Sequence, residues 1–188
     1  MTAQIRLESP FLESDIERLT AGSLVLISGI IYTARDAAHK KMVECLERGE
    51  DLPVELAGQT LYYMGPTPAR PGSIIGSCGP TTSGRMDGYT ARLLETGLRS
   101  MIGKGARSGA VKAAMVAHRA IYLVTYGGAG ALLSRRVKKA MVAGYPELGA
   151  EAIMRLEVEN FPALLVNDIY GADLFESERA KYASTGER

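Results

Sequence analysis

The sequence predicts an α/β fold built as one domain, on three observations. Short apolar runs typical of buried strands alternate along the chain with segments whose apolar residues recur at helical spacing. The 188 residues fall within the usual size of a single domain and can bury about 70% of the unfolded surface. No internal repeat or low-complexity linker divides the chain, so residues 1–188 are expected to form a single domain.

The expected elements follow from these patterns and from the glycines and polar residues that separate them. The expected strands are Leu24–Tyr32, Thr60–Met64, Ser73–Ser77, Arg99–Ile102, Ala120–Thr125, Ala152–Val158 and Ala163–Val166. The expected helices are Ala34–Arg48, Arg85–Thr96, Ser108–Arg119 and a short Ala129–Leu133. The polar segment after Phe175 is expected to form a frayed or peripheral helix, and residues 183–188 are expected to be disordered.

The most informative stretch is Gly79–Asp87, which leads from an expected strand straight into an expected helix. Backbone N–H groups left unpaired at residues 81–85 would favour a carboxylate or a phosphate, because the positive end of the helix dipole lies there too. Two hydroxyls and the guanidinium of Arg85 add to that preference. The alternative is an ordinary helix N-cap, in which Thr81 and Thr82 carry spare hydroxyls.

Two further cations occupy similar positions. Arg35 lies in the first turn of the helix after the first expected strand, where a positive charge opposes the helix dipole unless an anion binds nearby. The alternative is a solvated Arg35 paired with Asp36 or Glu55. Lys104 has glycine on both sides, which lets the backbone approach a ligand closely. With Arg85, these cations suit a small dianion, because guanidinium groups bind carboxylates through two nitrogens and an ammonium acts as a point charge.

A series of motifs extends along nearly the whole chain. They are Ser28–Lys40, Tyr63–Pro68, Gly79–Asp87, Lys104–Ser108, Tyr145–Gly149 and Glu157–Ala163. In this order they resemble the β subunit, or C-terminal domain, of the iron–sulfur class I fumarate hydratases and the related tartrate dehydratases. The segments Ser83–Asp87, Lys104–Ser108 and Tyr145–Gly149 look more like the fumarate branch than the tartrate branch.

The resemblance implies a swivelling β/β/α domain and a two-component hydro-lyase that interconverts fumarate and L-malate. A separate α subunit would hold a [4Fe–4S] cluster with one open iron, and the subunits would form a heterodimer or a heterotetramer. By the same resemblance, Thr81 corresponds to the catalytic base, while Arg35, Arg85 and Lys104 correspond to the residues that bind the substrate carboxylates. Tartrate or another hydroxy-diacid stays open as the alternative substrate.

The chemistry of this reaction suits the predicted cations. Removing a proton from the carbon beside a carboxylate and expelling hydroxide from the next carbon builds negative charge toward that carboxylate, which fixed cations stabilise. Threonine is a weak base because its hydroxyl pKa lies far above neutral, so Thr81 would need Arg85, backbone N–H groups and a dry site to stabilise its alkoxide. In the alternative assignment, Thr82 and Ser83 cap the helix.

The composition limits the cofactors and partners. Cys45 and Cys78 are too few for a cluster that ordinarily takes three or four cysteines, so we expect no metal on this chain. Their expected role is that of small buried hydrophobic residues, and the low cysteine content fits a reducing cytoplasm. A formal net charge of +1 gives no reason to expect nucleic acid or an anionic membrane surface as a partner. No apolar run approaches the roughly 18 residues of a spanning helix, and the N-terminus lacks a secretory signal pattern.

Other candidate motifs have simpler explanations. Gly103–Lys104 lacks the glycine and the hydroxyl residue of a phosphate-binding loop, and the glycines at 127–130 lack the third glycine of a dinucleotide site. His39 and His118 are remote from metal-ligand partners and are expected at the surface or in caps. The basic run Arg135–Lys139 is expected to form a solvated face. A non-catalytic swivelling or binding module is the alternative class, although three cations and a hydroxyl at strand ends favour an enzyme.

Overall fold

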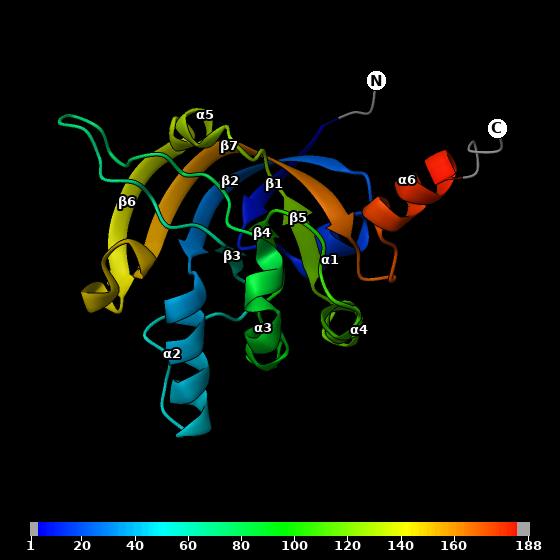
Figure 1. Ribbon diagram of the computed structural model, residues 1–188, viewed down its shortest axis with the longest axis horizontal. Helices are drawn as coiled ribbons and strands as arrows, with labels where there is room; N and C mark the ends of the chain where they lie inside the picture. The colour runs from blue at the N-terminus through cyan, green and yellow to red at the C-terminus, as the bar shows by residue number, and fades with distance from the viewer. Residues whose placement is uncertain (1–3, 184–188) are drawn as a thin grey trace.

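The computed structural model describes residues 4–183 and consists of a seven-stranded sheet with helices packed against it (Figure 1). The strands are β1 (Ile5–Ser9), β2 (Leu24–Thr33), β3 (Thr60–Tyr62), β4 (Ser100–Gly103), β5 (Ile121–Val124), β6 (Val137–Gly144) and β7 (Ile153–Asn167). The helices are α1 (Glu13–Glu17), α2 (Asp36–Glu47), α3 (Asp87–Leu94), α4 (Gly109–Ala117), α5 (Gly130–Ser134) and α6 (Leu174–Ala183), with the 3₁₀ helices η1 (Ser83–Met86) and η2 (Pro146–Glu151). The expected α/β class is confirmed.

The sheet closes on itself. Its order is β1-β2-β3-β4-β5-β7-β6, and β7 also pairs with β2. The first five strands of this order run parallel to one another, whereas β7 runs antiparallel to β2, β5 and β6. Strands β2, β3, β4, β5 and β7 therefore form a closed barrel, and β1 and β6 pair with the remaining lengths of β2 and β7.

A bulge allows the long strands β2 and β7 to pair in this way. The register of β2 with β7 shifts between Ile27 and Gly29, and Gly29 has a φ of 94°. A Cβ at Gly29 would lie 2.3 Å from the Ser9 carbonyl oxygen, so a side chain does not fit there. Across from it, Asn160 in β7 has a φ of 49°, and its N–H donates to Ser28 Oγ at 3.1 Å. Bulges of this kind bend a strand and increase its twist, which favours closure of the barrel.

Apolar side chains form two cores. One core fills the barrel and includes Tyr62, Ile102 and Phe161. The other lies between the barrel and the helices and includes Met42 of α2 and Leu93 of α3. Helix α3 contacts both α2 and α4, and all three lie on the same side of the barrel (Figure 1). The N-termini of these helices thus lie close to the ends of the parallel strands.

Most expected elements are present, with small differences at their ends. The expected strands Ala152–Val158 and Ala163–Val166 are one long strand, β7, because the bulge at Asn160 bends it without ending it. The sequence patterns do not predict β1, α1 or β6.

The basic residues of the run Arg135–Lys139 are exposed, as expected. The run leads into β6, where Lys138 and Lys139 form ion pairs with Glu159 and Glu157 of β7, at 2.9 Å in each case. Both lysines stay exposed in these pairs, so the expectation of a solvated face is confirmed. Pairing of opposite charges across two strands stabilises this edge of the sheet weakly.

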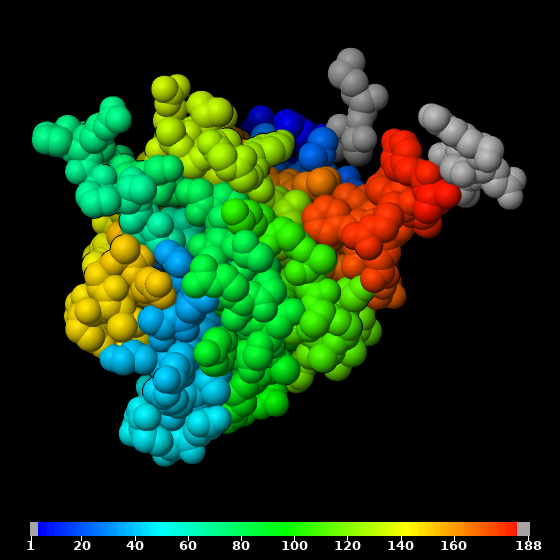
Figure 2. Space-filling view, in the orientation of Figure 1, coloured from blue at the N-terminus to red at the C-terminus, as the bar shows by residue number. Residues whose placement is uncertain are grey.

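The expected strand Ser73–Ser77 is absent, and these residues form bends within a loop over residues 65–78 that stands out from the body of the protein (Figure 2). The loop bonds to itself: the Thr67 N–H donates to the Ser77 carbonyl at 3.2 Å, and the Ser77 N–H donates to Thr67 Oγ1 at 2.8 Å. Gly76 permits this turn, because a Cβ there would lie 1.9 Å from the Thr67 carbonyl oxygen. The strand prediction is wrong because apolar composition alone does not distinguish a strand from such a loop.

The C-terminal segment agrees with the expected peripheral helix. Helix α6 has no buried residue, and Lys112 of α4 holds its beginning through ion pairs with Asp173 at 3.1 Å and Glu176 at 2.5 Å. The tail expected to be disordered comprises residues 183–188. Ala183 is instead the last residue of α6, and residues 184–188 lie outside the residues that the structure describes. Within residues 4–183, no helix is long and apolar enough to cross a membrane.

Replacing Gly103, the last residue of β4, by alanine should destabilise the protein. A Cβ at this position would lie 1.9 Å from Ser83 Oγ and 3.1 Å from the Tyr63 ring, so the η1 turn would have to move. Overpacking of this kind costs about 1–3 kcal/mol, which urea unfolding would measure as a lower midpoint. Gly84→Ala is the matched control, because nothing lies within 4 Å of a Cβ there. Equal midpoints for the two variants would contradict this account of the packing.

Candidate active site

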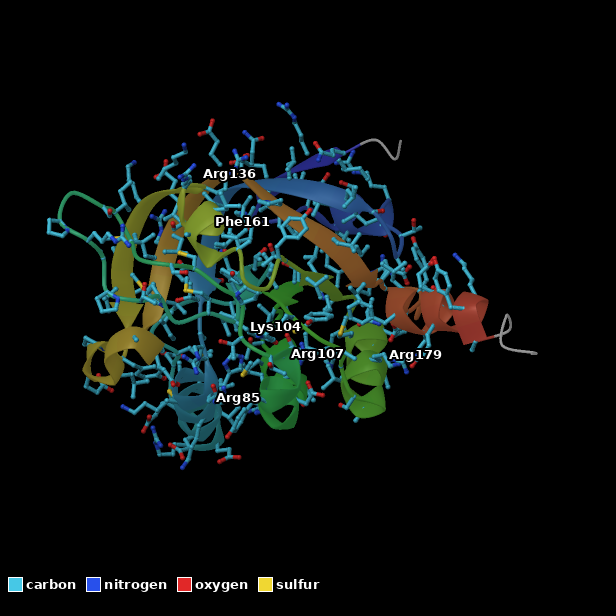
Figure 3. All side chains as sticks on the ribbon, turned by 45° about the horizontal axis from the view of Figure 1, so that its top comes forward. Arg85, Lys104, Arg107, Arg136, Phe161 and Arg179 are labelled. Carbon is cyan, nitrogen blue, oxygen red and sulfur yellow. The ribbon has the colours of Figure 1, made fainter. Side chains whose placement is uncertain are left out.

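The ends of the parallel strands β2 and β4 carry two of the predicted cations. Arg35 is the N-cap residue of α2, just after β2, and Lys104 follows the last residue of β4. Thr81 precedes η1, and Arg85 lies within it. Thr82 of the same turn forms a parallel β-bridge with Lys104. The four predicted residues therefore come from neighbouring segments at one edge of the barrel, and Figure 3 shows Arg85 and Lys104 close to the start of α3.

Asp36, the first residue of α2, links two of the predicted cations. Its Oδ1 lies 2.8 Å from Nε of Arg85, and its Oδ2 lies 3.7 Å from Nη2 of Arg35. A second carboxylate, Oε1 of Glu151, lies 3.6 Å from the same Nη2. The alternative pairing of Arg35 with Asp36 is thus present, but the second partner is Glu151 and not Glu55.

Arg35 has hydrogen-bonding capacity that the protein does not use. Its side chain is only 23% exposed, and its Nε is buried without a partner. Both ion pairs are longer than a hydrogen bond, and within residues 4–183 the guanidinium makes no hydrogen bond. A buried donor without a partner is costly, so Arg35 favours an anion that brings acceptor atoms to it.

The 81–85 turn does not present the expected set of free N–H groups. The N–H groups of Thr81 and Ser83 donate to the carbonyls of Tyr63 and Lys104, at 2.7 and 2.9 Å. These bonds fasten the turn to the segments that follow β3 and β4, so the backbone donors there are partly used. The Thr81 hydroxyl, in contrast, makes no hydrogen bond to the described part of the chain and is available to a ligand.

The hydroxyls after Thr81 do not cap the helix as the alternative assignment expects. Thr82 occupies the N-cap position of η1 without a side-chain hydrogen bond. Ser83 Oγ accepts the Lys104 N–H at 3.2 Å and is hydrogen-bonded to the Tyr122 hydroxyl at 2.8 Å, and Tyr122 donates to the Gly105 carbonyl at 2.8 Å. Because a carbonyl only accepts, Tyr122 takes its other hydrogen bond from Ser83. This chain of hydrogen bonds fixes the backbone on both sides of Lys104.

Arg107 is a buried cation that the sequence analysis does not single out. Its Nε lies 2.8 Å from Oδ1 of Asp87, and its terminal nitrogens donate to Thr90 Oγ1 at 2.6 Å and to the Tyr63 hydroxyl at 3.2 Å. The guanidinium also lies over the Tyr122 ring, 5.1 Å from its centroid. Burial alone would lower the pKa of Arg107, but Tyr63 and Asp87 hold that pKa above its ordinary value.

Arg107 and Asp87 join two of the sequence motifs. The second oxygen of Asp87, Oδ2, accepts the Ser108 N–H at 2.8 Å, so the segment after β4 is tied to the first residue of α3. Figure 3 shows Arg85, Lys104 and Arg107 gathered where α3 meets the barrel. The sequence signal that could have revealed this ion pair is the opposite charge of Asp87, in the motif Gly79–Asp87, and Arg107, in the motif Lys104–Ser108.

Comparison with known proteins identifies the family. Residues 1–178 match the Fumarase C-terminus family. The chain belongs to this family. It is 42% identical over 152 residues to the aerobic class I fumarate hydratase of Salmonella typhimurium and 37% identical over 167 residues to fumarate hydratase 2 of Leishmania major. It is also 34% identical over 175 residues to the putative L(+)-tartrate dehydratase subunit beta of Methanocaldococcus jannaschii.

These relatives differ in how much of their length the chain covers. The matches include 80% and 88% of this chain but only 26% and 29% of the two fumarate hydratases. The match to the tartrate dehydratase subunit includes 90% of this chain and 90% of that protein. This member of the Fumarase C-terminus family thus spans just over a quarter of the length of these two fumarate hydratases.

The cysteines of this family member do not suit an iron–sulfur cluster. Cys45 and Cys78 are free and buried, as expected. Cys45 Sγ donates to the Asp51 carbonyl at 3.1 Å, and burial raises the pKa of the Cys78 thiol to about 12, whereas a metal ligand is a thiolate. Among the side chains of residues 4–183, no group of three or more His, Cys, Asp or Glu could hold a metal ion. A [4Fe–4S] cluster therefore does not fit the side chains of residues 4–183.

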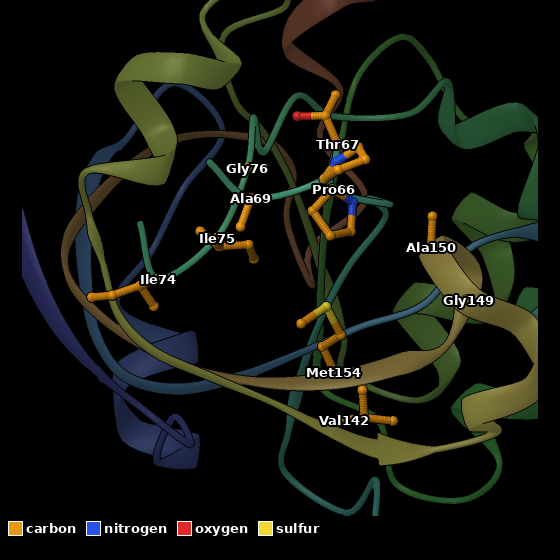
Figure 4. Close-up of a pocket in the computed structure, with 11 residues that line it drawn as sticks. Pro66, Thr67, Ala69, Ile74, Ile75, Gly76, Val142, Gly149, Ala150 and Met154 are labelled. Atoms are coloured by element: carbon orange, nitrogen blue, oxygen red, sulfur yellow. The ribbon is translucent and has the colours of Figure 1, made fainter. Parts of the chain in front are cut away.

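A hollow of about 320 Å³ lies between the 65–78 loop and strands β6 and β7 (Figure 4). Its wall is mainly apolar and includes Pro66, Ile75, Val142 and Met154. None of the four predicted site residues lines it. It is a neighbour of the candidate site, because Ala150 in its wall precedes Glu151, the partner of Arg35.

His39 is fully buried, so the expectation of a surface or capping position is wrong for it, whereas His118 is the C-cap of α4. Nδ1 of His39 donates to the Arg35 carbonyl at 2.8 Å, and Nε2 is buried without a partner. The ring meets that of Tyr63 edge to face, with centroids 5.1 Å apart. Burial is the main cause that lowers the pKa of His39 from 6.5 to about 4, and the charge of Arg107 lowers it further.

Acid should destabilise the protein through His39. The folded state resists protonation of this ring until about pH 4, whereas the ring of an unfolded chain takes a proton near pH 6.5. Stability is therefore fully present above pH 6.5 and falls as the pH drops toward 4, by up to about 1.4 kcal/mol per pH unit and about 3 kcal/mol in all. Urea unfolding at a series of pH values measures this slope.

A pair of variants separates His39 from other groups that titrate in the same range. His39→Asn should flatten the slope between pH 4 and 6.5, while His118→Gln should keep it. An unchanged slope in His39→Asn would assign the acid sensitivity to other residues.

Proposed function

We propose that the chain is the β subunit of a two-component class I fumarate hydratase, which hydrates fumarate reversibly to L-malate. Membership of the Fumarase C-terminus family and the names of the relatives support this proposal. The observation that carries it is the pair Arg35 and Arg85, linked through Asp36, beside Lys104 and the free hydroxyl of Thr81.

In this proposal the cations bind the two substrate carboxylates. Arg35 offers nitrogens without hydrogen-bond partners, and the half-exposed Arg85 is paired only through its Nε within the described chain. Lys104 adds an exposed ammonium, and hydrogen bonds to the Lys104 N–H and the Gly105 carbonyl fix the backbone on either side of it. Guanidinium groups bind carboxylates through two nitrogens, and fixed positive charge stabilises the negative charge that builds as the proton leaves carbon.

Thr81 is the proposed base, which takes the proton on its Oγ1. Its backbone is fixed by the hydrogen bond to Tyr63, and its hydroxyl has no competing protein partner among the described residues. A threonine alkoxide needs nearby positive charge. Arg85 lies on the same turn as Thr81, and Lys104 follows β4 and pairs with that turn through Thr82.

We propose that a separate α subunit holds the [4Fe–4S] cluster, in a heterodimer or a heterotetramer. The name of the Methanocaldococcus relative, a subunit beta, supports a partner, and the buried cysteines support a cluster outside this chain. The cluster would supply Lewis-acid chemistry at the departing hydroxyl. Two free thiols fit a reducing compartment, and we propose the cytoplasm.

The second candidate is the β subunit of an L(+)-tartrate dehydratase. The relative of that name supports it, because the match covers 90% of both proteins. Tartrate is also a hydroxy-diacid and would use the same cations. A non-catalytic swivelling or binding module is less well supported, since docking alone requires neither the buried Arg35 Nε without a hydrogen bond nor the free hydroxyl of Thr81.

Anaerobic reconstitution tests this proposal. The chain alone should bind no iron and show no turnover, while the chain combined with an iron–sulfur α subunit should hydrate fumarate faster than it dehydrates L(+)-tartrate. Stoichiometric [4Fe–4S] absorbance on the isolated chain would contradict the division of labour. Faster tartrate turnover would select the second candidate, and no turnover with a loaded cluster would select the binding module.

Arg85→Lys in the assembled enzyme should weaken transition-state binding. The substitution keeps the charge but removes the planar fork, with an expected cost of about 1–3 kcal/mol, or about 5- to 150-fold in kcat/KM. Arg92→Lys is the matched control, because Arg92 is an exposed residue of α3 that pairs with Glu95. A kcat/KM for Arg85→Lys equal to that of the control would remove Arg85 from the site.

Thr81→Ala should instead abolish turnover while substrate binding persists, because the three cations are unchanged. Steady-state kcat and the inhibition constant of succinate, a non-reacting dicarboxylate, separate the two effects. Thr82→Ala, at an exposed hydroxyl without a cap hydrogen bond, is the control and should keep kcat. A kcat of Thr81→Ala within roughly threefold of wild type, a barrier change well under 1.4 kcal/mol, would rule Thr81 out as the base.

A further inference from the structure

We propose that Asp36 is a positioning residue for Arg85, a role that rests on the proposed function. It holds the guanidinium by its Nε, so that the two terminal nitrogens stay free for a substrate carboxylate. The contact joins Asp36 Oδ1 and Arg85 Nε at 2.8 Å, and the terminal nitrogens of Arg85 have no partner within residues 4–183.

Asp36 is the fixed member of this pair. It is the first residue of the twelve-residue helix α2, where a carboxylate is stabilised by the helix dipole, and it is only 29% exposed. Arg85 is 53% exposed and carries a long side chain with many rotamers. A restrained carboxylate beside a mobile guanidinium limits the orientations that the guanidinium adopts.

The same carboxylate also ties Arg85 to Arg35. Oδ2 of Asp36 lies 3.7 Å from Nη2 of Arg35, and this oxygen is buried without a hydrogen bond. One side chain thus faces both cations through separate oxygens. The contacts of Asp36 with Arg35 and Arg85 are ion pairs and not hydrogen bonds. A substrate carboxylate can therefore form well-aligned hydrogen bonds to the two guanidinium groups without breaking a hydrogen bond to Asp36.

A double-mutant cycle in the assembled enzyme tests the role of Asp36. Asp36→Asn should lower kcat/KM for fumarate by about 10- to 100-fold, and the same substitution in an Arg85→Ala background should cost less than threefold. Glu44→Gln, which removes an equal charge from an exposed position of α2, should leave kcat/KM unchanged. A purely structural effect at the start of α2 would persist in the Arg85→Ala background and would overturn the proposal. A lower KM with unchanged kcat in Asp36→Asn would also overturn it, because Asp36 would then only compete with substrate.

A second measurement needs no turnover and uses the full chain alone. The Arg85 Nε–H resonance, identified by its loss in Arg85→Lys, should shift or broaden in Asp36→Asn and stay in place in Glu44→Gln. An unchanged resonance in Asp36→Asn would overturn the positioning role. If the assembled enzyme turns over no hydroxy-diacid while the resonance shifts as expected, the proposed function fails and the Asp36–Arg85 contact stands.

Discussion

The pairing of β2 with β7 is the constraint on which the rest of the structure depends. It turns a twisted sheet into a closed barrel, and the bulge formed by Gly29 of β2 and Asn160 of β7 provides the bend that closure needs. Closure fixes the parallel strands β2, β3 and β4 with their carboxyl ends at one edge. The candidate site is assembled there because β2 and β4 lead directly to Arg35 and Lys104. The turn that carries Thr81 and Arg85 is hydrogen-bonded to the residues that follow β3 and β4.

Buried polar contacts then hold those segments at fixed distances. Arg107 is fully buried and bonded to Asp87, Thr90 and Tyr63, and Ser83 and Tyr122 hold the backbone around Lys104. Removing one partner of a buried ion pair typically costs about 3–5 kcal/mol, because the remaining charge stays buried. The site is therefore built on a rigid base, while Arg35 and Arg85 are held only by longer or more exposed ion pairs.

The sequence predicts the α/β class and most strands and helices because their apolar periodicity is strong and local. It correctly places Arg35 and Lys104 after strands, because each follows an apolar run. The strand expected before Thr81 and Arg85 is a loop, so their placement at a strand end is wrong. The sequence does not predict the loop over residues 65–78, which is held by hydrogen bonds between Thr67 and Ser77. It also does not predict β6, because the lysines of this strand interrupt the apolar pattern that indicates a strand.

Partners that are distant in sequence are also missed, since no local pattern encodes them. Glu151 reaches Arg35 across more than a hundred residues, and the burial of His39 and Arg107 depends on the packing of α2 and α3 over the barrel. The family resemblance locates the site, whereas the contacts that hold it in place come from tertiary structure. The roles assigned to the four residues stay predictions.

The two carboxylates beside Arg35 change how the candidate site attracts an anion from a distance. Asp36 and Glu151 pair with Arg35 and Arg85, so these four groups together with Lys104 carry a single excess positive charge. A dianion that binds there reverses the sign of that charge, and the field reaching into solvent before binding is weak. Selection of the substrate would then depend on contact geometry at short range and hardly on long-range electrostatic steering. The rate of substrate association would therefore change little with ionic strength.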